Sequence, residues 1–153
     1  MTGELTVRRY EPGDAERVWE LHVAAMRDAG TDPAAMPPQD DLRDVEGAYF
    51  PGGEFLVGER DGHIVAMGGF QPRDGETVEL KRMRVAPDHQ RRGYGTRILA
   101  ALEDRARERG FRRAVLDTAV RQDSPPFYRA RGYEAVGREQ WREFDLVCFE
   151  KEL

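Results

Sequence analysis

The stretch that decides the fold is VELKRMRVAPDHQRRGYGTRILAALEDRARERG, residues 78–110. It begins with a strand-like run that ends at Ala86-Pro87-Asp88, and a polar turn containing Gly93 and Gly95 follows. Apolar residues then recur at helical spacing, which predicts a long amphipathic helix over 94–109. The order strand, glycine-containing turn, helix is therefore the first structural prediction.

The predicted helix has one apolar face and one charged face. We expect the apolar stripe to pack on a sheet and the charged side chains to face water, with Glu103 and Arg107 forming a solvated i,i+4 pair. Gly110 is expected to end the helix. The stripe consists of Ile98, Leu99, Leu102 and Ala106, and the charged face of Arg97, Glu103, Arg105, Arg107 and Glu108.

The turn before the helix has the composition of an anion site. Backbone N–H groups at a helix start have no partner within the helix, and the helix dipole places partial positive charge there. Gly93 and Gly95 would let an anion approach this backbone closely, while Arg91 and Arg92 add positive charge. The sequence predicts a phosphate or pyrophosphate site, although helix capping alone would also explain a polar turn with glycine.

Two better-known phosphate motifs are excluded. The pattern G-x-x-x-x-G-K-[ST] is absent, which argues against a P-loop nucleotide hydrolase. The dinucleotide fingerprint requires a third small residue, and Ile98 occupies that place. Nucleotide hydrolysis and hydride transfer are therefore disfavoured.

Strands and helices are expected on both sides of this unit. The order β-α-α-β-β-β-α-β-α-β-β predicts an α/β fold with a mixed, mostly antiparallel sheet and helices on both faces. Its central parallel unit runs from strand 77–86 through the long helix to strand 112–118. The other expected elements are strand 6–10, a helix through Val18 to Met26, a helical part of the loop 30–53 at about 40–50, a hairpin at Asp61-Gly62, a short helix from Ser124 to Gly132, and strands 133–138 and 143–151.

Composition limits the class of protein. With 153 residues, the chain is expected to form one domain over 1–153. It lacks an apolar run of membrane-spanning length and the apolar core of a signal peptide, so a cytoplasmic location is expected. A net charge of −5 disfavours a nucleic-acid partner. Cys148, the only cysteine, is expected to be a small buried hydrophobe, and the three scattered histidines suggest no metal site.

Two motifs in the sequence resemble the GNAT superfamily of N-acetyltransferases. The stretch 78–110 is similar to the family's strand, Q/R-x-x-G-x-G/A turn and long helix, and LDTAVRQDSPPFYRARGYEAVG (116–137) is similar to its next strand and helix. Both motifs occur in the family's order and at its spacing, and the resemblance covers essentially the whole chain. It implies binding of acetyl-CoA and acetyl transfer to a primary amine, which would belong to a small molecule or a protein.

The resemblance also implies which residues hold the cofactor. The backbone of Met83, Arg84 and Val85 would pair with the pantetheine arm, and the amides from Arg91 to Thr96 would hold the pyrophosphate. Asp123 or Ser124 would replace the asparagine that many relatives use. The full set expected at the cofactor is Met83, Arg84, Val85, Arg91, Arg92, Gly93, Tyr94, Gly95, Thr96 and Ser124. A homodimer is expected by analogy with relatives.

Two residues are expected to carry the proton transfers of a direct, ternary-complex reaction. Tyr128 aligns with the tyrosine that relatives place near the thioester sulfur, where a phenol can act as general acid; the alternative is an aromatic that packs its helix on the sheet. Glu79 aligns with a strand glutamate that serves as general base in the histone-acetylating branch. The alternative for Glu79 is a solvated carboxylate paired with Lys81 or an arginine.

The amine side is less determined. We expect its pocket to involve the loop 30–53, the first helices and the closing strands. Acidic residues of this loop, Asp41 among them, would attract a cationic amine or simply lie on the surface, and the surface interpretation is favoured. His22, on the apolar stripe of the first helix, is interpreted as a satisfied core histidine. The rival to an enzyme is a non-catalytic acyl-CoA-binding sensor of the same fold.

Overall fold

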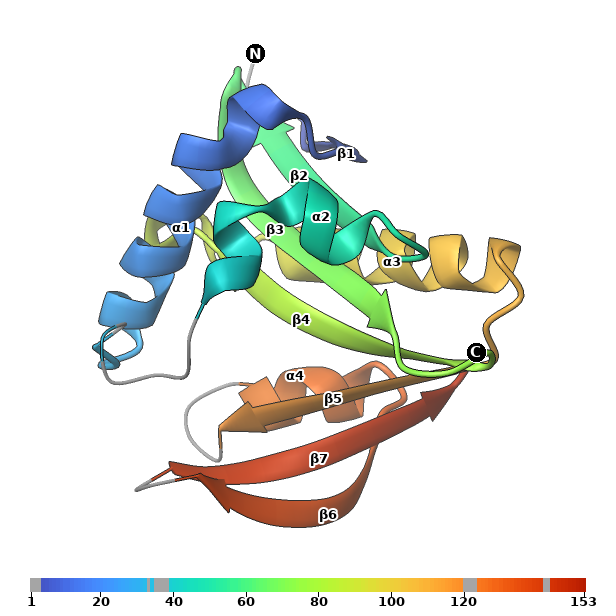
Figure 1. Ribbon diagram of the computed structural model, residues 1–153. Coiled ribbons are helices and arrows are strands. Elements are labelled where there is room, and N and C mark those ends of the chain that lie inside the picture. The colour runs from blue at the N-terminus through green and yellow to red at the C-terminus, as the bar shows by residue number, and fades with distance from the viewer. Residues whose placement is uncertain (1–3, 33, 35–38, 120–123, 142–143) are drawn as a thin grey trace.

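The protein is built on one seven-stranded sheet. A computed structural model describes residues 4–32, 34, 39–119, 124–141 and 144–153 (Figure 1). The strand order is β1-β2-β3-β4-β5-β7-β6, and β4 and β5 are parallel while the other neighbours are antiparallel. This confirms the predicted mixed sheet with its central parallel unit. The strands are β1 (Thr6–Arg9), β2 (Glu54–Arg60), β3 (His63–Pro72), β4 (Thr77–Val85), β5 (Arg113–Ala119), β6 (Glu134–Trp141) and β7 (Phe144–Glu152).

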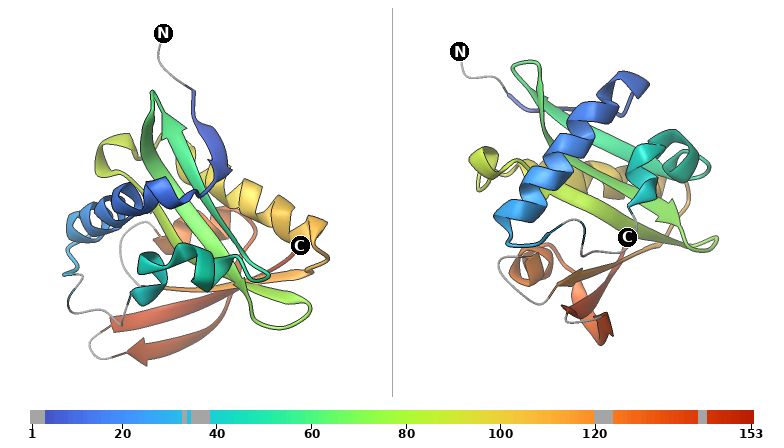
Figure 2. Two further views of the ribbon diagram at one scale, coloured as in Figure 1. Left: turned by 45° about the horizontal axis from the view of Figure 1, so that its top comes forward. Right: turned by 60° about the vertical axis from the view of Figure 1, so that its left-hand side comes forward.

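Helices cover both faces of the sheet, as predicted. In Figures 1 and 2, α1 and α2 lie on one face of the first strands, and α3 runs along the opposite face. The fourth helix, α4, shares its core with α3. The helices are α1 (Ala15–Asp28), α2 (Val45–Tyr49), α3 (Tyr94–Glu108) and α4 (Ser124–Ala130). Within the part of the chain that the structure describes, none of the helices has both the length and the apolar character needed to cross a bilayer.

Each face of the sheet has its own hydrophobic core. On the α3 side, the predicted stripe of α3 is buried against strand residues such as Leu80 and Phe149. On the α1 side, Val18 of α1 and Tyr49 of α2 pack against Phe55 and Met67 of the sheet. The sheet lies between these two cores, and Val78 and Leu80 anchor β4 in the α3-side core. This positions the strand that carries Glu79, Met83, Arg84 and Val85 of the predicted site.

The charged face of α3 is not wholly solvated as expected. Glu103 is only 7% exposed, and its carboxylate accepts hydrogen bonds from the hydroxyl of Tyr133 at 2.8 Å and from Nζ of Lys151 at 3.0 Å. Arg107 instead pairs with Asp104, at 3.1 Å between Nη1 and Oδ1. The prediction of a solvated Glu103–Arg107 pair is therefore wrong, because strand β7 and the segment after α4 cover that turn of the helix.

The predicted turns are present where the sequence places glycine. Asp61 (φ 52°) and Gly62 (φ 79°) both adopt positive φ in the β2–β3 hairpin, as a tight two-residue turn requires. Gly110 follows α3 with a φ of 89°, in the left-handed conformation that commonly ends helices. Within the predicted helical segment 40–50, the structure forms a 3-10 helix (Asp40–Arg43) and then α2.

Candidate active site

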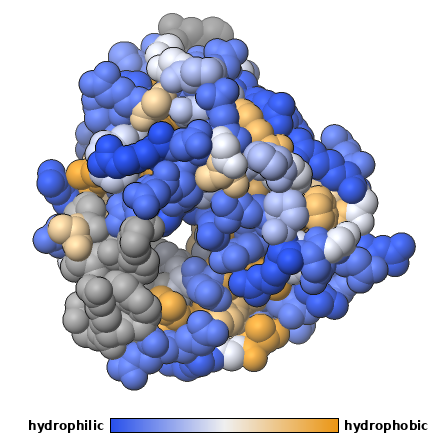
Figure 3. Space-filling model, viewed as in Figure 1, coloured by the Kyte–Doolittle hydropathy of each residue, from blue (hydrophilic) through white to orange (hydrophobic). Residues whose placement is uncertain are grey.

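Strands β4 and β5 pair at one end and then separate. Their register contains three pairs, Thr77 with Arg113, Val78 with Ala114, and Glu79 with Val115. Both strands continue for several residues beyond this point and diverge (Figure 1). The space-filling view is hollowed at its centre, over the region where these strands separate (Figure 3). Among the described residues, the backbone of β4 from Leu80 to Val85 therefore has a strand partner on the β3 side only.

A bulge in β4 directs arginine side chains to the α1 face. Lys81 lies opposite Gly69 and Arg84 opposite Met67, so two residues, Arg82 and Met83, oppose Gly68 alone. Arg82 has a φ of 59°, the left-handed conformation that a bulge can impose on one residue. Met83 and Val85 pack on the α3 core, whereas Arg82 binds Asp41 on the opposite face.

The turn that enters α3 exposes backbone N–H groups at a helix N-terminus. Gly93, the N-cap, has a φ of 82°, and Arg91 also has a positive φ of 63°. Gly95 is different, because its φ is not positive and a Cβ there would make ordinary contacts with the Phe127 ring at 3.4 Å and with Val85 at 3.6 Å. The folded chain thus has room for a side chain at Gly95. A glycine at this position also leaves the backbone open to close approach by a ligand.

A third arginine lies beside this turn. Nε of Arg131, after α4, donates a hydrogen bond to Oγ1 of Thr96 at 2.8 Å, and its guanidinium lies 4.0 Å from the centroid of the Phe127 ring. A second bond runs from Nη1 to the carbonyl of Phe127 at 2.9 Å. This positive charge is fixed at the start of α3, beside the turn that carries Arg91 and Arg92. The contact depends on the packing of α4 against α3, which exists only in the folded chain.

Tyr128 is both a packing residue and a protonated phenol. It is 7% exposed, and its ring contacts those of Phe127, Tyr133 and Phe149. Burial raises the pKa of Tyr128 to about 12, against the opposing charge of Arg84. The phenol therefore keeps its proton near neutral pH, which a general acid requires. Ser124 is the first residue of α4, whereas Asp123 lies outside the described residues.

Glu79 lies where the β4–β5 pairing ends. Its neighbours Val78 and Leu80 are buried in the α3 core, and the alternation of a strand turns Glu79 to the other face. Its Oε1 accepts a hydrogen bond from Nη2 of Arg73 at 3.2 Å, and its side chain is 26% exposed. Glu79 thus has an arginine partner, as the alternative interpretation predicted. Its carboxylate is also partly exposed, at the point where β4 and β5 begin to separate.

A polar cluster on the α1 face, which sequence reasoning missed, adjoins the bulge. We define it as His22, Gln39, Asp41, Tyr49, Arg82 and Arg84. Asp41 accepts the hydroxyl of Tyr49 at 2.6 Å and the side-on guanidinium of Arg82, from Nε at 3.0 Å and from Nη2 at 2.8 Å. The favoured interpretation of Asp41 as a surface residue is wrong, because β4 brings Arg82 against it.

The electrostatics of the cluster follow from its burial. Burial acts to raise the pKa of Asp41, but the hydrogen bonds of Arg82 and Tyr49 outweigh it and lower the pKa below 3.8. His22 is fully buried, and burial lowers its pKa to about 4. Its Nε2 lies 2.7 Å from Oε1 of Gln39, while Nδ1 has no partner in the described part of the chain. His22 is therefore a neutral core histidine that is satisfied at one nitrogen.

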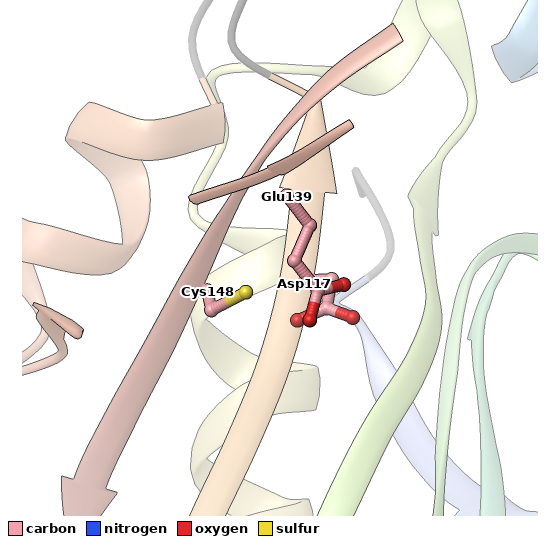
Figure 4. A group of neighbouring side chains, drawn as sticks. All are labelled: Asp117, Glu139 and Cys148. Atoms are coloured by element: carbon pink, nitrogen blue, oxygen red, sulfur yellow. The ribbon is translucent and has the colours of Figure 1, made fainter. Parts of the chain in front are cut away.

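Cys148 lies next to two carboxylates on strands β5 and β6. The ligand atoms of Asp117, Glu139 and Cys148 lie within 4.8 Å of one another (Figure 4). Burial, together with the hydrogen bond and charge of Asp117, raises the pKa of the half-buried thiol to about 11. Cys148 is therefore less buried than expected and is held in the protonated form, which is a poor nucleophile.

Known proteins resemble the chain in sequence and in fold. Residues 15–133 match the Acetyltransferase (GNAT) family. A Xenopus tropicalis protein named "Probable N-acetyltransferase 14" is 38% identical over 76 residues, which make up 49% of this chain and 37% of that protein. The chain spans less than half the length of the first curated relatives that it matches.

Two solved structures illustrate the likeness in fold. An acetyltransferase from Streptococcus agalactiae superposes with a TM-score of 0.86 at 22% identity, covering 97% of this chain and 98% of that one. An acetyltransferase from Salmonella typhimurium, solved with its cofactor acetyl-CoA, has a TM-score of 0.79 at 22% identity and covers 98% and 94%. The structure is thus an α/β protein with the acetyltransferase fold. Since the family match extends over most of its residues, the chain belongs to the GNAT family of acetyltransferases.

Proposed function

We propose that the protein is an acetyl-CoA-dependent N-acetyltransferase that transfers the acetyl group directly to a primary amine in a ternary complex. The observation that carries this proposal is the divergence of β4 from β5 just before the N-terminus of α3. One unpaired strand edge and one set of helix N–H groups follow each other along the chain. They match the two halves of a CoA molecule, an amide-containing arm and a pyrophosphate.

The residues present fit this co-substrate. The backbone of Met83, Arg84 and Val85 would pair with the pantetheine arm on the side of β4 that faces away from β3. The turn residues Arg91, Arg92, Gly93, Tyr94, Gly95 and Thr96 would hold the pyrophosphate, and Arg131 adds a charge beside them. Ser124, at the start of α4, would contact the cofactor near the thioester. The space above Gly95 is the observation that supports a close backbone approach.

Tyr128 and Glu79 would carry out the two proton transfers. Tyr128 would protonate the CoA thiolate as it leaves, because its phenol is buried and protonated. Glu79 would accept the amine proton, directly or through water, from the mouth of the strand divergence. Cys148 is kept protonated by its surroundings, which is consistent with direct transfer rather than an acyl-enzyme. A cytoplasmic location, one domain over 1–153 and a homodimer remain predictions.

Turnover distinguishes this function from the alternative, a sensor that binds acyl-CoA without transfer. The protein is incubated with acetyl-CoA and a panel of primary amines while free thiol is followed. We expect thiol release that depends on at least one amine. Tight binding of acetyl-CoA by calorimetry, with no amine-dependent thiol release across the panel, would instead identify the sensor.

A further inference from the structure

Two arginines of β4 project to the α1 face and have different partners. Arg82 binds Asp41 side-on, with Nε and Nη2 of the guanidinium each donating to one carboxylate oxygen. This is the bidentate geometry in which arginine recognises carboxylates. Arg84 lies two residues further along, after the same bulge. The Arg82–Asp41 pair shows how the cluster binds a carboxylate.

Arg84 has no carboxylate partner within the described chain. Its Nη1 donates a hydrogen bond to the carbonyl of Met83 at 3.0 Å, and its buried Nε has no acceptor among the described residues. Arg82 uses its Nε–Nη2 edge to bind Asp41. The same edge of Arg84 therefore has no carboxylate partner in the described chain. Burial and the nearby charge of Arg82 lower the pKa of Arg84 to about 10, so the group is still charged at neutral pH. A charge held in this way favours binding of an anion.

The surroundings of Arg84 place that anion near the reacting groups. Its charge acts on Tyr128, the proposed acid, and also on Asp41, Tyr49 and His22 of the polar cluster. Arg84 pairs with Met67, a residue of the α1-side core, and its guanidinium is close enough for its charge to act on Tyr128 and on the polar cluster. The site proposed above for the phosphates of CoA is a different one, at the start of α3, with Arg91, Arg92 and Arg131. The anion at Arg84 would belong to the other substrate.

We propose that Arg84 binds a carboxylate of the acceptor through its Nε–Nη2 edge, so that the acceptor is a small molecule carrying both a primary amine and a carboxylate, as an amino acid does. This inference rests on the proposed function and names the substrate class of that site. A carboxylate fixed beside Tyr128 would orient the amine toward the thioester. Protein lysines and protein N-termini lack a free carboxylate close to the amine and fit this site less well.

The test compares each amino acid with its own carboxamide. A panel of α-, β- and γ-amino acids and their primary amides is assayed by thiol release, with the wild type and with Arg84→Gln. We expect the wild type to prefer one or more acids and Arg84→Gln to reduce the acid-to-amide ratio of kcat/KM by roughly 10- to 100-fold, the range for a hydrogen bond to a charged group. Arg84→Lys should restore part of the ratio. Arg107→Gln removes the same charge from an exposed position on α3 and should leave the ratio unchanged.

The comparison within one variant cancels the different amine basicities of acids and amides. Equal losses for acid and amide in Arg84→Gln would overturn the inference, as would a wild type that turns over only amides or other uncharged amines. Loss of acetyl-CoA binding by calorimetry in Arg84→Gln would overturn it too, because the arginine would then serve the cofactor.

A second readout separates this inference from the proposed function. The same acids are tested for raising the melting temperature of the CoA-saturated protein. Stabilisation that requires Arg84, without turnover, would support carboxylate binding while contradicting the transferase. Turnover of amines with neither stabilisation by acids nor an effect of Arg84 on the ratio would support the transferase while contradicting carboxylate binding.

Discussion

The two sides of the β4–β5 divergence differ in whether backbone groups or side chains are available to a ligand. On the α3 side, the turn Gln90–Thr96 offers backbone N–H groups, and its glycines leave that backbone accessible. On the α1 side, the polar cluster consists of side chains from α1, the 3-10 helix, α2 and β4. One site is contiguous in sequence, whereas the other unites residues up to 62 positions apart, from His22 to Arg84.

The two kinds of site differ in how easily their ligand specificity can change. A backbone site recognises what all CoA esters share, a pyrophosphate and an amide-containing arm. A side-chain site can change its ligand with single substitutions while the sheet stays the same. The predictions below test whether the two sides are as independent as this comparison implies.

The largest effect is expected from Gly95→Asp on the backbone side. An acidic side chain in the first turn is compatible with the helix dipole, so α3 should stay folded, while its charge repels the pyrophosphate. We expect the affinity for acetyl-CoA to fall by about 10³-fold or more, measured by calorimetry, in line with the loss of several charge-assisted hydrogen bonds. Gly75→Asp, in an open turn outside the proposed site, serves as the control and should leave the affinity unchanged. Unchanged affinity in Gly95→Asp would remove the pyrophosphate from this turn.

Tyr128→Phe tests the phenol that is proposed as the general acid. The ring packing is retained and only the hydroxyl is removed, so kcat should fall by roughly 10²-fold or more, the usual contribution of a general acid, with little change in cofactor affinity. Tyr133→Phe is the matched control, because its hydroxyl bonds Glu103 and its loss should affect stability by about 1 kcal/mol rather than turnover. A Tyr128→Phe protein with wild-type kcat would leave Tyr128 only its packing role.

Asp41→Asn tests how much the Arg82–Asp41 pair contributes to the stability of the polar cluster. The change leaves Arg82 partly buried without its counter-charge and should lower the free energy of unfolding by roughly 2–3 kcal/mol, measured by urea denaturation. Asp40→Asn, an exposed neighbour, should change it by no more than about 0.5 kcal/mol. If the sides are independent, acetyl-CoA affinity should be the same in both variants. A large loss of acetyl-CoA affinity in Asp41→Asn alone would show that the two sides are not independent.

Glu79→Gln addresses the proposed base. We expect kcat to fall by roughly tenfold to a hundredfold and the part of the pH–rate profile that rises with pH to become flatter. Glu76→Gln, in the exposed turn before β4, controls for the loss of one negative charge. An unaltered pH–rate profile in Glu79→Gln would show that another group or water removes the amine proton, and Glu79 would then be the partner of Arg73 only.

His22 provides the smallest effect and a pH signature. Because the pKa of His22 falls from 6.5 to about 4 on folding, the unfolded chain binds more protons between these values. The contribution of His22 to the free energy of unfolding is therefore fully present above pH 6.5 and is lost as the pH falls toward 4. The expected loss between pH 7 and pH 5 is about 2 kcal/mol. His22→Gln should lose less free energy of unfolding over this range, whereas the exposed His63→Gln should behave as the wild type. Equal slopes for all three proteins would contradict the neutral buried histidine.

The elements of the fold were predictable because their signals are local. The apolar stripe of α3, the paired positive φ angles at Asp61-Gly62 and the glycine after α3 each act within a few residues. The turn into α3 was predictable for the same reason, since helix-start chemistry depends on consecutive residues. Resemblance to a family then supplied roles for Tyr128 and Glu79 that their local sequence did not.

The errors share one physical origin. Glu103 and Asp41 were both interpreted as solvated, because charged residues are usually exposed and their sequence neighbours are polar. In the folded chain, Lys151 and Tyr133 cover Glu103, and Arg82 covers Asp41. Each partner is more than 25 residues away in sequence, so no window along the chain could have revealed it.

The order of the elements, the parallel unit around α3 and the glycine-containing turn before it could be predicted from the sequence, because they depend on periodicity and on adjacent residues. Which charges are buried and which are paired depends on the tertiary structure. It bound Arg82 to Asp41 and left Arg84 without a carboxylate within the described residues. Such pairing depends on how α1, α2 and β4 pack together, and that arrangement exists only once the sheet has formed.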